Sequence, residues 1–319
     1  MRRYLTGKLS APAVLVPYPG PLLSPGAQDV FLYLRPESNG VLVESLLLRV
    51  VKSRRFCERC SVVYLVNMPG DFVIRNRIIE EHYALKIRFA RCGKTCFTRA
   101  MKQKFEAFFR VPFGEARIIG AFAAERLLGV TYEDLFTLRV SREDFTVIEG
   151  QSIKKYRGHF IVNYDIPAIL HKNSRRTDFA VMIFRSLLDR EEFHSMVEEM
   201  QELLVTEKVV AAGRPLARTF HYSSGPFEQI LDGIGYLFDR DGRHLPLESI
   251  SFFAYLLENG VARRDILRSV RNPIMRFRKP DGEVFEENLF TYTIAESFSG
   301  ALAKFNRRTG SCPQQCAAG

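Results

Sequence analysis

The sequence contains no tryptophan and no long hydrophobic run. Its longest apolar segments, residues 41–51 and 118–128, are interrupted by Glu44, Arg49 and Glu125, so neither reaches the roughly 18 apolar residues of a membrane-spanning helix. The basic start of the chain is followed by an apolar run of about four residues, which is too short for the core of a signal peptide. We therefore expect a soluble, cytoplasmic protein.

Cysteine is also scarce, with six residues in three close pairs. This number favours a reducing compartment over a disulfide framework. The pairs in residues 57–60 and 92–96 have the internal spacing of a four-cysteine zinc site. We expect residues 62–66 and 84–90 to form parallel strands, which would hold the two pairs about 20 Å apart at roughly 3.3 Å per residue. The sequence therefore predicts no metal site, argues against zinc and indicates no cofactor.

Acidic residues are sparse in the first third of the chain. Residues 1–120 contain 20 Lys and Arg against 9 Asp and Glu, whereas the remainder contains 26 against 27. The net charge of +10 therefore comes from the first third. Such asymmetry favours a polyanionic partner, nucleic acid first and acidic phospholipid second. The alternative is a basic bias of the whole proteome, without functional meaning.

The remaining composition is that of an ordinary globular protein, with 46% hydrophobic and 26% charged residues. The 26 phenylalanines must supply most of the bulky core. A chain of 319 residues fits one large domain or two unequal ones.

Hydrophobic periodicity predicts alternating strands and helices. The alternation between residues 41 and 90 resembles βαβ units, so we predict a mixed α/β fold with a mostly parallel, covered sheet in the N-terminal two-thirds. Strands are expected at residues 13–16, 30–34, 62–66, 84–90, 145–148, 160–164 and 179–184, and helices at residues 41–52, 72–82, 97–111, 115–128 and 191–205.

Glycine and proline become frequent after residue 210, which suggests a domain boundary. We predict an α/β domain over residues 1–210 and a smaller, helix-rich α+β module over residues 211–305. The module should contain a hairpin that turns at Lys279-Pro280-Asp281-Gly282. Residues 306–319 are predicted to form a flexible tail.

The best candidate for an anion site is Gly93-Lys94-Thr95, because it follows a predicted strand and opens a predicted helix. Such a turn directs backbone N–H groups at an anion, while Lys94 adds charge and Thr95 caps the helix. The segment is no P-loop, since the glycine expected five residues before Gly93 is Arg88. The alternative is an ordinary helix start with a threonine cap.

In a parallel sheet the loops at residues 67–71, 93–95 and 163–165 would share one edge. Asp71 and Asp165 would then approach Lys94, as acid/base residues or metal ligands for a phosphorylated small molecule. In the alternative interpretation, Asp71 shapes a Pro-Gly turn and Asp165 opens a helix.

Eight basic residues against one acid make residues 86–110 strongly basic. On a helix Phe97, Met101, Phe105 and Phe108 fall on one stripe, which predicts that they pack inward. The cations on the other face are left to meet phosphates, or to pair with the acidic helix of residues 191–205. The candidate nucleic-acid-binding residues are Arg88, Arg91, Arg99, Lys102 and Arg110.

Three functions follow from these patterns. The leading hypothesis is a protein that binds nucleic acid or another polyanion on a basic face in residues 49–117. The second is an enzyme that acts on a phosphorylated small molecule at the three loops. The third is an assembly subunit without catalysis. No catalytic triad and no histidine metal motif is present.

Overall fold

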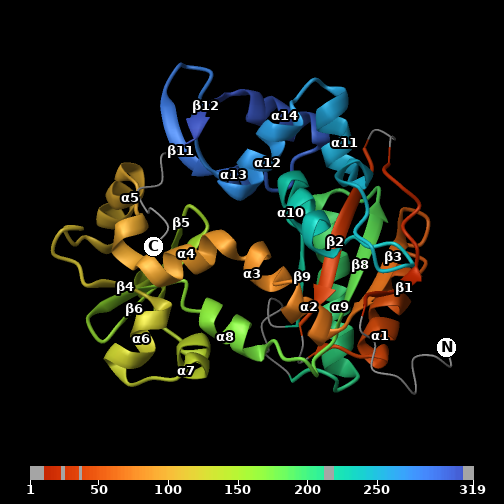
Figure 1. Cartoon of the computed structure of the whole chain (residues 1–319), viewed down its shortest axis with the longest axis horizontal. Helices are drawn as coiled ribbons and strands as arrows, with labels where there is room; N and C mark the ends of the chain where they lie inside the picture. Colours follow the sequence, from red (N-terminus) through yellow and green to blue (C-terminus); the bar gives the residue numbers. More distant parts are fainter. Residues whose placement is uncertain (1–10, 23–25, 36–37, 212–218, 312–319) are drawn as a thin grey trace. The chain divides into compact units, whose positions relative to one another are not determined.

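The structure is a computed structural model that describes residues 11–22, 26–35, 38–211 and 219–311 (Figure 1). The chain divides into two units, each made of three separated segments. Unit 1 comprises residues 1–78, 173–266 and 293–302, and unit 2 comprises residues 79–172, 267–292 and 303–319. The predicted boundary near residue 210 and the predicted tail beyond residue 311 stay predictions, because residues 212–218 and 312–319 lie outside the described part of the chain, whereas residues 308–311 form a strand.

A five-stranded sheet forms the centre of unit 1. Its strand order is β1-β3-β8-β2-β9, and each of these neighbouring pairs is antiparallel. The prediction of a mostly parallel sheet is therefore wrong. The strands are β1 (Ala13–Val16), β2 (Gln28–Leu34), β3 (Cys60–Met68), β8 (Phe179–Ser186) and β9 (Phe220–Tyr222).

Helices cover both faces of this sheet. Helices α1 (Val41–Val51) and α9 (Arg190–Thr206) pack on one face, in a cluster that includes Leu32. On the other face Tyr33 packs against Tyr236 of α10 (Pro226–Tyr236), with ring centroids 5.2 Å apart. Strands buried on both faces have the continuous apolar runs that are typical of parallel sheets. The prediction itself failed because the βαβ alternation expected over residues 41–90 needed a second strand at residues 84–90, and these residues form a helix.

The other helices of unit 1 are short. They are α2 (Gly70–Arg75), α11 (Ser251–Glu258) and the 3₁₀ turn η6 (Leu247–Ser249). Three helices continue from one unit into the other, namely α3 (Ile78–His82), α12 (Arg263–Arg271) and α14 (Phe298–Asn306). Within the described residues, no helix is both long and apolar enough to cross a bilayer.

Unit 2 contains two small sheets. The first has the order β4-β7-β6-β5, in which only β4 and β7 run parallel, and the second has the antiparallel order β11-β10-β12. The predicted turn at residues 279–282 joins β10 to β11. The strands are β4 (Ile118–Gly120), β5 (Phe145–Ile148), β6 (Gln151–Tyr156), β7 (His159–Val162), β10 (Ile274–Arg278), β11 (Val284–Asn288) and β12 (Arg308–Ser311).

The helical elements of unit 2 are α4 (Ala84–Cys92), η3 (Gly93–Cys96), α5 (Arg99–Phe109), α6 (Ala121–Leu128), α7 (Tyr132–Thr137), η4 (Arg142–Asp144), α8 (Ile166–Lys172) and α13 (Leu289–Tyr292). Helices α4 and α5 of unit 2 pack in a cluster rich in phenylalanine, which includes Phe97, Phe105 and Phe160, and α6, α7 and α8 pack in a second cluster. The rings of Phe105 and Phe160 lie 4.8 Å apart.

Residues 84–90, predicted as a strand, belong to helix α4. Leu85 and Phe89 pack against one hydrophobic cluster, while Ile87 and Ala90 belong to another. A helix buried on two sides places apolar residues at alternating positions over a short stretch, and this imitates the period of a strand.

Candidate functional site

The net charge is concentrated in unit 2. This unit contains 24 Lys and Arg against 15 Asp and Glu, or +9, and unit 1 contains 22 against 21, or +1. Of the +11 that the sequence places in residues 1–120, +6 lies in unit 1, where acidic residues of the other segments offset it, and +5 lies in unit 2, to which residues 267–292 and 303–319 add +4.

The basic residues near the start of the predicted face are already paired within unit 1. Arg49, Arg55 and Arg59 lie 2.6, 3.4 and 2.5 Å from Glu207, Glu199 and Glu192, which line α9 and its end. The acidic helix therefore has cationic partners, as one alternative proposed. They come from residues 49–59, whereas the sequence suggested residues 97–111.

Helix α5 has a buried apolar side, and Arg99 and Lys102 lie outside it. Phe97, Met101 and Phe105 are buried, which confirms that these apolar residues pack inward. Phe108 is 42% exposed, so its inclusion in the core stripe was wrong. Arg99 and Arg110 are exposed and Lys102 is half-buried.

The five candidate nucleic-acid-binding residues have no carboxylate partner among the described residues. Arg91 lies 5.8 Å from the ring centroid of Phe122, and Lys102 lies 5.4 Å from that of Phe113. Glu106, the one acid of residues 86–110, accepts a hydrogen bond from the backbone N–H of Phe113 at 2.7 Å. The positive charges of Arg88, Arg91, Arg99, Lys102 and Arg110 are therefore not neutralised locally.

The predicted anion site has a different local structure. Gly93, Lys94 and Thr95 form the turn η3 after α4, so no strand precedes them. The Nζ of Lys94 donates to the carbonyl oxygens of Gly114 at 2.7 Å and Ala116 at 3.3 Å. Lys94 thereby ties this turn to the loop before β4.

The start of α5 lies after this turn. Its N-cap is Thr98, whose Oγ1 accepts from the backbone N–H of Met101 at 3.2 Å. Thr95 instead donates its hydroxyl to the carbonyl of Cys92 at 3.1 Å. The geometric reason for placing an anion on residues 93–95 is thus absent, and anion binding there stays a prediction.

Asp71 and Asp165 belong to different units and each has local partners. Asp71 lies in α2 and pairs with Arg75 at 3.0 Å and with Arg175 at 3.7 Å. Asp165 accepts from the hydroxyl of Ser152 at 3.2 Å, just before α8. The shared strand edge that would unite them depended on a parallel sheet, and their catalytic role stays an untested hypothesis.

Sequence reasoning missed a second group of arginines in unit 2. Arg276 and Arg278 of β10 are exposed, while Met275 before them and Phe277 between them are buried. The backbone N–H of Arg278 donates to the carbonyl of Arg307 at 2.9 Å, which places the exposed Arg307 beside β10. The sequence pattern that could have predicted this group is a basic residue at every second position of a strand. A charge count over thirds of the chain does not resolve such a pattern.

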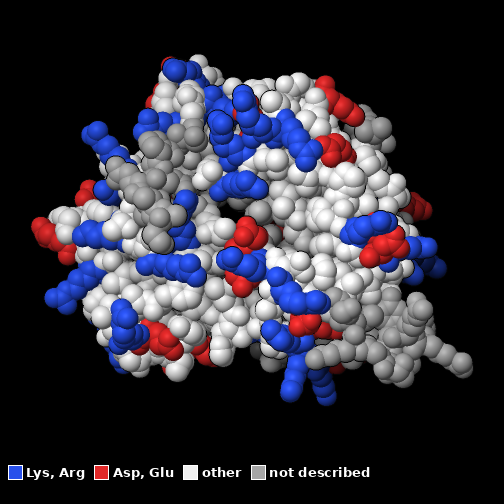
Figure 2. Space-filling model, in the orientation of Figure 1, with Lys and Arg blue, Asp and Glu red and all other residues white. Residues whose placement is uncertain are grey.

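The surface view shows the same concentration of charge. In Figure 2 a dense group of Lys and Arg side chains lies over the region of α12 and α14. Arg268 and Arg271 of α12 are exposed. Together with β10 and β12, they form the C-terminal contribution to the charge of unit 2.

Unit 1 contains a pocket of about 530 Å³, within the range of small-molecule sites. It is lined by the end of β8, the first turns of α9, residues 222–224 and part of residues 294–297. At its wall the N–H and the hydroxyl of Ser224 both donate to Glu228, each at 2.6 Å, and His221 lies 3.4 Å from the same carboxylate.

This arrangement resembles a catalytic dyad but lacks the required basicity. Burial by itself raises the pKa of Glu228, yet His221 and the donors of Ser224 outweigh it and hold the pKa at about 2. Such a carboxylate is a poor base for a serine hydroxyl at neutral pH. Because Glu228 lies in the first turn of α10, its bonds to Ser224 fix the start of that helix.

The cysteine pairs lie in separate units. Cys57 and Cys92 are exposed, while Cys60 and Cys96 are buried. Residues 84–90 form a helix, so the expected strand no longer separates the two pairs, and the absence of zinc stays a prediction. Over the described ranges, no cluster of three or more His, Cys, Asp or Glu residues is arranged to hold a metal ion.

Comparison with protein-family models, curated proteins and solved structures finds no match to this chain. Function must therefore be argued from charge, burial and contacts. By these criteria the strongest candidate is the set of cations on α4 and α5 of unit 2.

Proposed function

We propose that the protein binds nucleic acid through unit 2, where exposed Lys and Arg residues contact the phosphate backbone. The observation that carries the proposal is the set of five cations without a carboxylate partner among the described residues, in a unit of net charge +9. The proposal narrows the basic face of residues 49–117 to its portion in unit 2, because Arg49, Arg55 and Arg59 are paired with α9.

Binding of this kind is electrostatic and tolerant of sequence. Each phosphate neutralised by Lys or Arg releases condensed counterions, so affinity falls steeply with salt. Base stacking on Phe97 or Phe105 is not supported, since both rings are buried in the core. Contacts with phosphate fix the position of a protein on the duplex but carry no sequence information directly.

The other two hypotheses have less support. An enzyme acting on a phosphorylated small molecule needs residues 67–71, 93–95 and 163–165 at one sheet edge, and these loops come from two units. An assembly subunit without catalysis is favoured by no specific contact. Neither hypothesis accounts for the concentration of positive charge in unit 2.

The test compares two triple variants on duplex DNA at three salt concentrations. Changing Arg99, Lys102 and Arg110 together to Ala should reduce the slope of log affinity against log salt by about 0.9 per lost phosphate contact, hence by roughly 2 to 3. Weakening should be equal on unrelated sequences, because phosphate contacts do not read bases.

The control variant changes Arg49, Arg55 and Arg59 to Ala. It removes as many charges, but these are engaged by α9, so the salt slope should stay at its original value. Denaturation curves of both variants show whether folding is preserved. Absence of binding to DNA and RNA at low salt, or equal slopes in the two variants, would contradict the proposal. Binding to heparin without binding to DNA or RNA would indicate another polyanion.

A further inference from the structure

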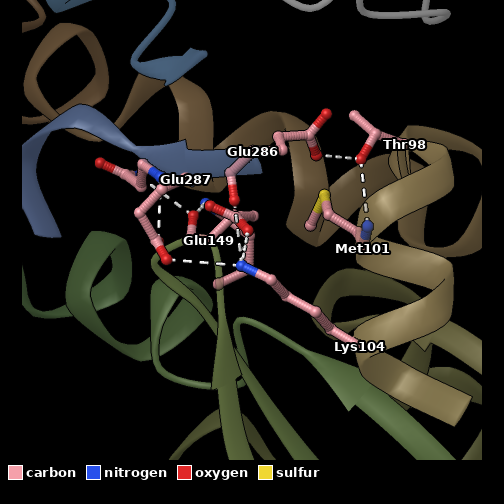
Figure 3. A network of polar contacts seen from close by, with 8 residues as sticks. Thr98, Met101, Lys104, Glu149, Glu286 and Glu287 are labelled. Carbon is pink, nitrogen blue, oxygen red and sulfur yellow. Dashed lines mark hydrogen bonds and ion pairs between the residues drawn. The ribbon is translucent and has the colours of Figure 1, made fainter. Parts of the chain in front are cut away.

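A network of acidic groups surrounds Lys104, on the side of α5 away from Arg99 and Arg110. The Nζ of Lys104 donates to the carboxyl of Glu149, lies 3.4 Å from Glu287 Oε2, and donates to the carbonyl of Glu286 at 3.1 Å (Figure 3). Glu149 lies in the turn between β5 and β6, and the other two belong to β11. One ammonium group thus joins three elements of unit 2.

Glu149 occupies an unusual position for a glutamate. Its side chain is 0% exposed, and both turn residues have positive φ, 48° for Glu149 and 74° for Gly150. Such two-residue hairpin turns strongly prefer Asn, Asp or Gly at the first position. The carbonyl of Glu149 accepts from Gln151 Nε2 at 2.9 Å and from Asn288 Nδ2 at 3.1 Å, so the turn is fastened to β11 as well.

One oxygen of the buried Glu149 carboxyl lacks a hydrogen-bond donor within the described part of the chain. Lys104 satisfies Glu149 Oε1, but Oε2 is buried and receives no hydrogen bond from any described residue. The carboxyl of Glu287 contacts the same ammonium group, with Oε2 3.4 Å from Lys104 Nζ, so the two carboxyls are neighbours. Two ionised carboxylates offer only acceptors to each other, whereas a single added proton turns the contact into a hydrogen bond.

The other charged group in the network is already engaged. Glu286 is 6% exposed, and its carboxylate accepts from the hydroxyl of Thr98. Glu287 accepts from the backbone N–H of Asn288 at 3.0 Å through Oε1. The groups facing Glu149 are therefore Lys104 from α5 and Glu287 from β11, one cation and one anion.

We propose that Glu149 and Glu287 share a proton, and that this pair, with Lys104 beside it, is a proton-operated latch that closes the β5–β6 turn onto α5 and β11. Loss of the proton leaves two carboxylates with one ammonium group in a buried site, and the turn opens more often. The latch is independent of nucleic-acid binding, and its test requires no ligand.

The electrostatics of the site agree with this geometry. Burial, followed by the charge of Glu287, raises the pKa of Glu149 to about 8, although Lys104 opposes the shift. Burial by itself lowers the pKa of Lys104, but its contacts with Glu149 and Glu287 raise it overall. Lys104 therefore keeps its charge through the range in which Glu149 titrates.

The first experiment measures thermal unfolding of the whole chain between pH 5 and pH 9. The pKa of Glu149 is about 8 in the folded chain against an ordinary value of 4.5, so its stabilising contribution is complete below pH 4.5 and is lost as pH rises through 8. Glu149→Gln keeps a donor towards Glu287 at every pH. Its melting temperature relative to the native chain should therefore rise by roughly 4 °C or more from pH 5 to pH 9.

Glu115→Gln is the matched control, because Glu115 is exposed. Its melting temperature should follow that of the native chain throughout. The proposal is overturned if the melting temperature of Glu149→Gln, relative to that of the native chain, stays constant or falls as pH rises.

A direct titration covers the case in which Glu149→Gln folds poorly. The carboxyl carbon of Glu149, followed by NMR in the native chain, should titrate with a midpoint near 8. In Glu287→Gln the midpoint should fall, since the neighbouring negative charge is gone. A native midpoint at the ordinary value for glutamate, or a midpoint unmoved by Glu287→Gln, would refute a shared proton.

Discussion

At the scale of single residues, Asp29 shows how a charge is accommodated in the core of unit 1. It is 3% exposed and takes two bonds from Arg185, at 2.8 and 2.9 Å. The hydroxyls of Tyr18 and Ser251 also donate to it, at 2.5 and 2.7 Å. Every partner of this carboxylate is a donor, which is the condition under which a buried ion is tolerated.

We predict that Asp29→Asn lowers the free energy of unfolding by about 3 kcal/mol, because it leaves the mostly buried Arg185 without its counter-charge. Chemical denaturation gives the value. Asp281→Asn is the matched control, since Asp281 is exposed in the β10–β11 turn and should change stability by less than about 0.5 kcal/mol. Equal effects of the two substitutions would show that the buried pair contributes nothing.

At the scale of elements, a close backbone approach holds α4 against the end of β4, where α6 begins. A Cβ added to Gly120 would lie 2.1 Å from the carbonyl oxygen of Ala90. Gly120 itself has φ −78° and ψ 154°, which any residue adopts, so the need for glycine is one of space.

Gly120→Ala should therefore destabilise the chain by at least about 2 kcal/mol, through displacement of backbone rather than through strain in φ. Gly114→Ala is the control, because nothing lies within 4 Å of the added Cβ. Melting temperatures of the two variants test the difference. If Gly120→Ala leaves the melting temperature unchanged, α4 and β4 can move apart without loss of stability.

Elements also show how much the sequence could predict. The expected strands at residues 30–34, 145–148 and 179–184 lie within β2, β5 and β8. β6 was missed because Lys154 interrupts its pattern. This lysine is 6% exposed, and its Nζ donates to the carbonyl of Leu138 at 2.5 Å, a partner that no local pattern reveals.

The candidate site was predictable only in part. The orientation of α5 followed from helical periodicity, since Phe97 and Phe105 are buried and Arg99 is exposed. The pairing of Arg49 with Glu207 joins residues far apart in the chain, and a charge count treats both as unpaired. Glu149 likewise acquires its environment from α5 and β11, so nothing in its own segment marks it.

At the scale of the whole molecule, the arginines of β10 and its neighbour extend the proposed interface beyond α4 and α5. Arg276, Arg278 and Arg307 changed together to Ala should weaken binding to DNA and lower the salt slope by up to roughly 3. Salt titrations like those used for α5 measure this. An unchanged slope would confine the interface to α4 and α5.

The strand order of unit 1 has a consequence for synthesis on the ribosome. β2 and β3 do not pair with each other, because β8 lies between them in the sheet. About 120 residues separate Met68, where β3 ends, from Ser186, where β8 ends. At about 5–20 residues per second, the two strands wait roughly 6 to 24 s for their common partner. During that time the edges that later pair with β8 stay unpaired and open to solvent or to a chaperone.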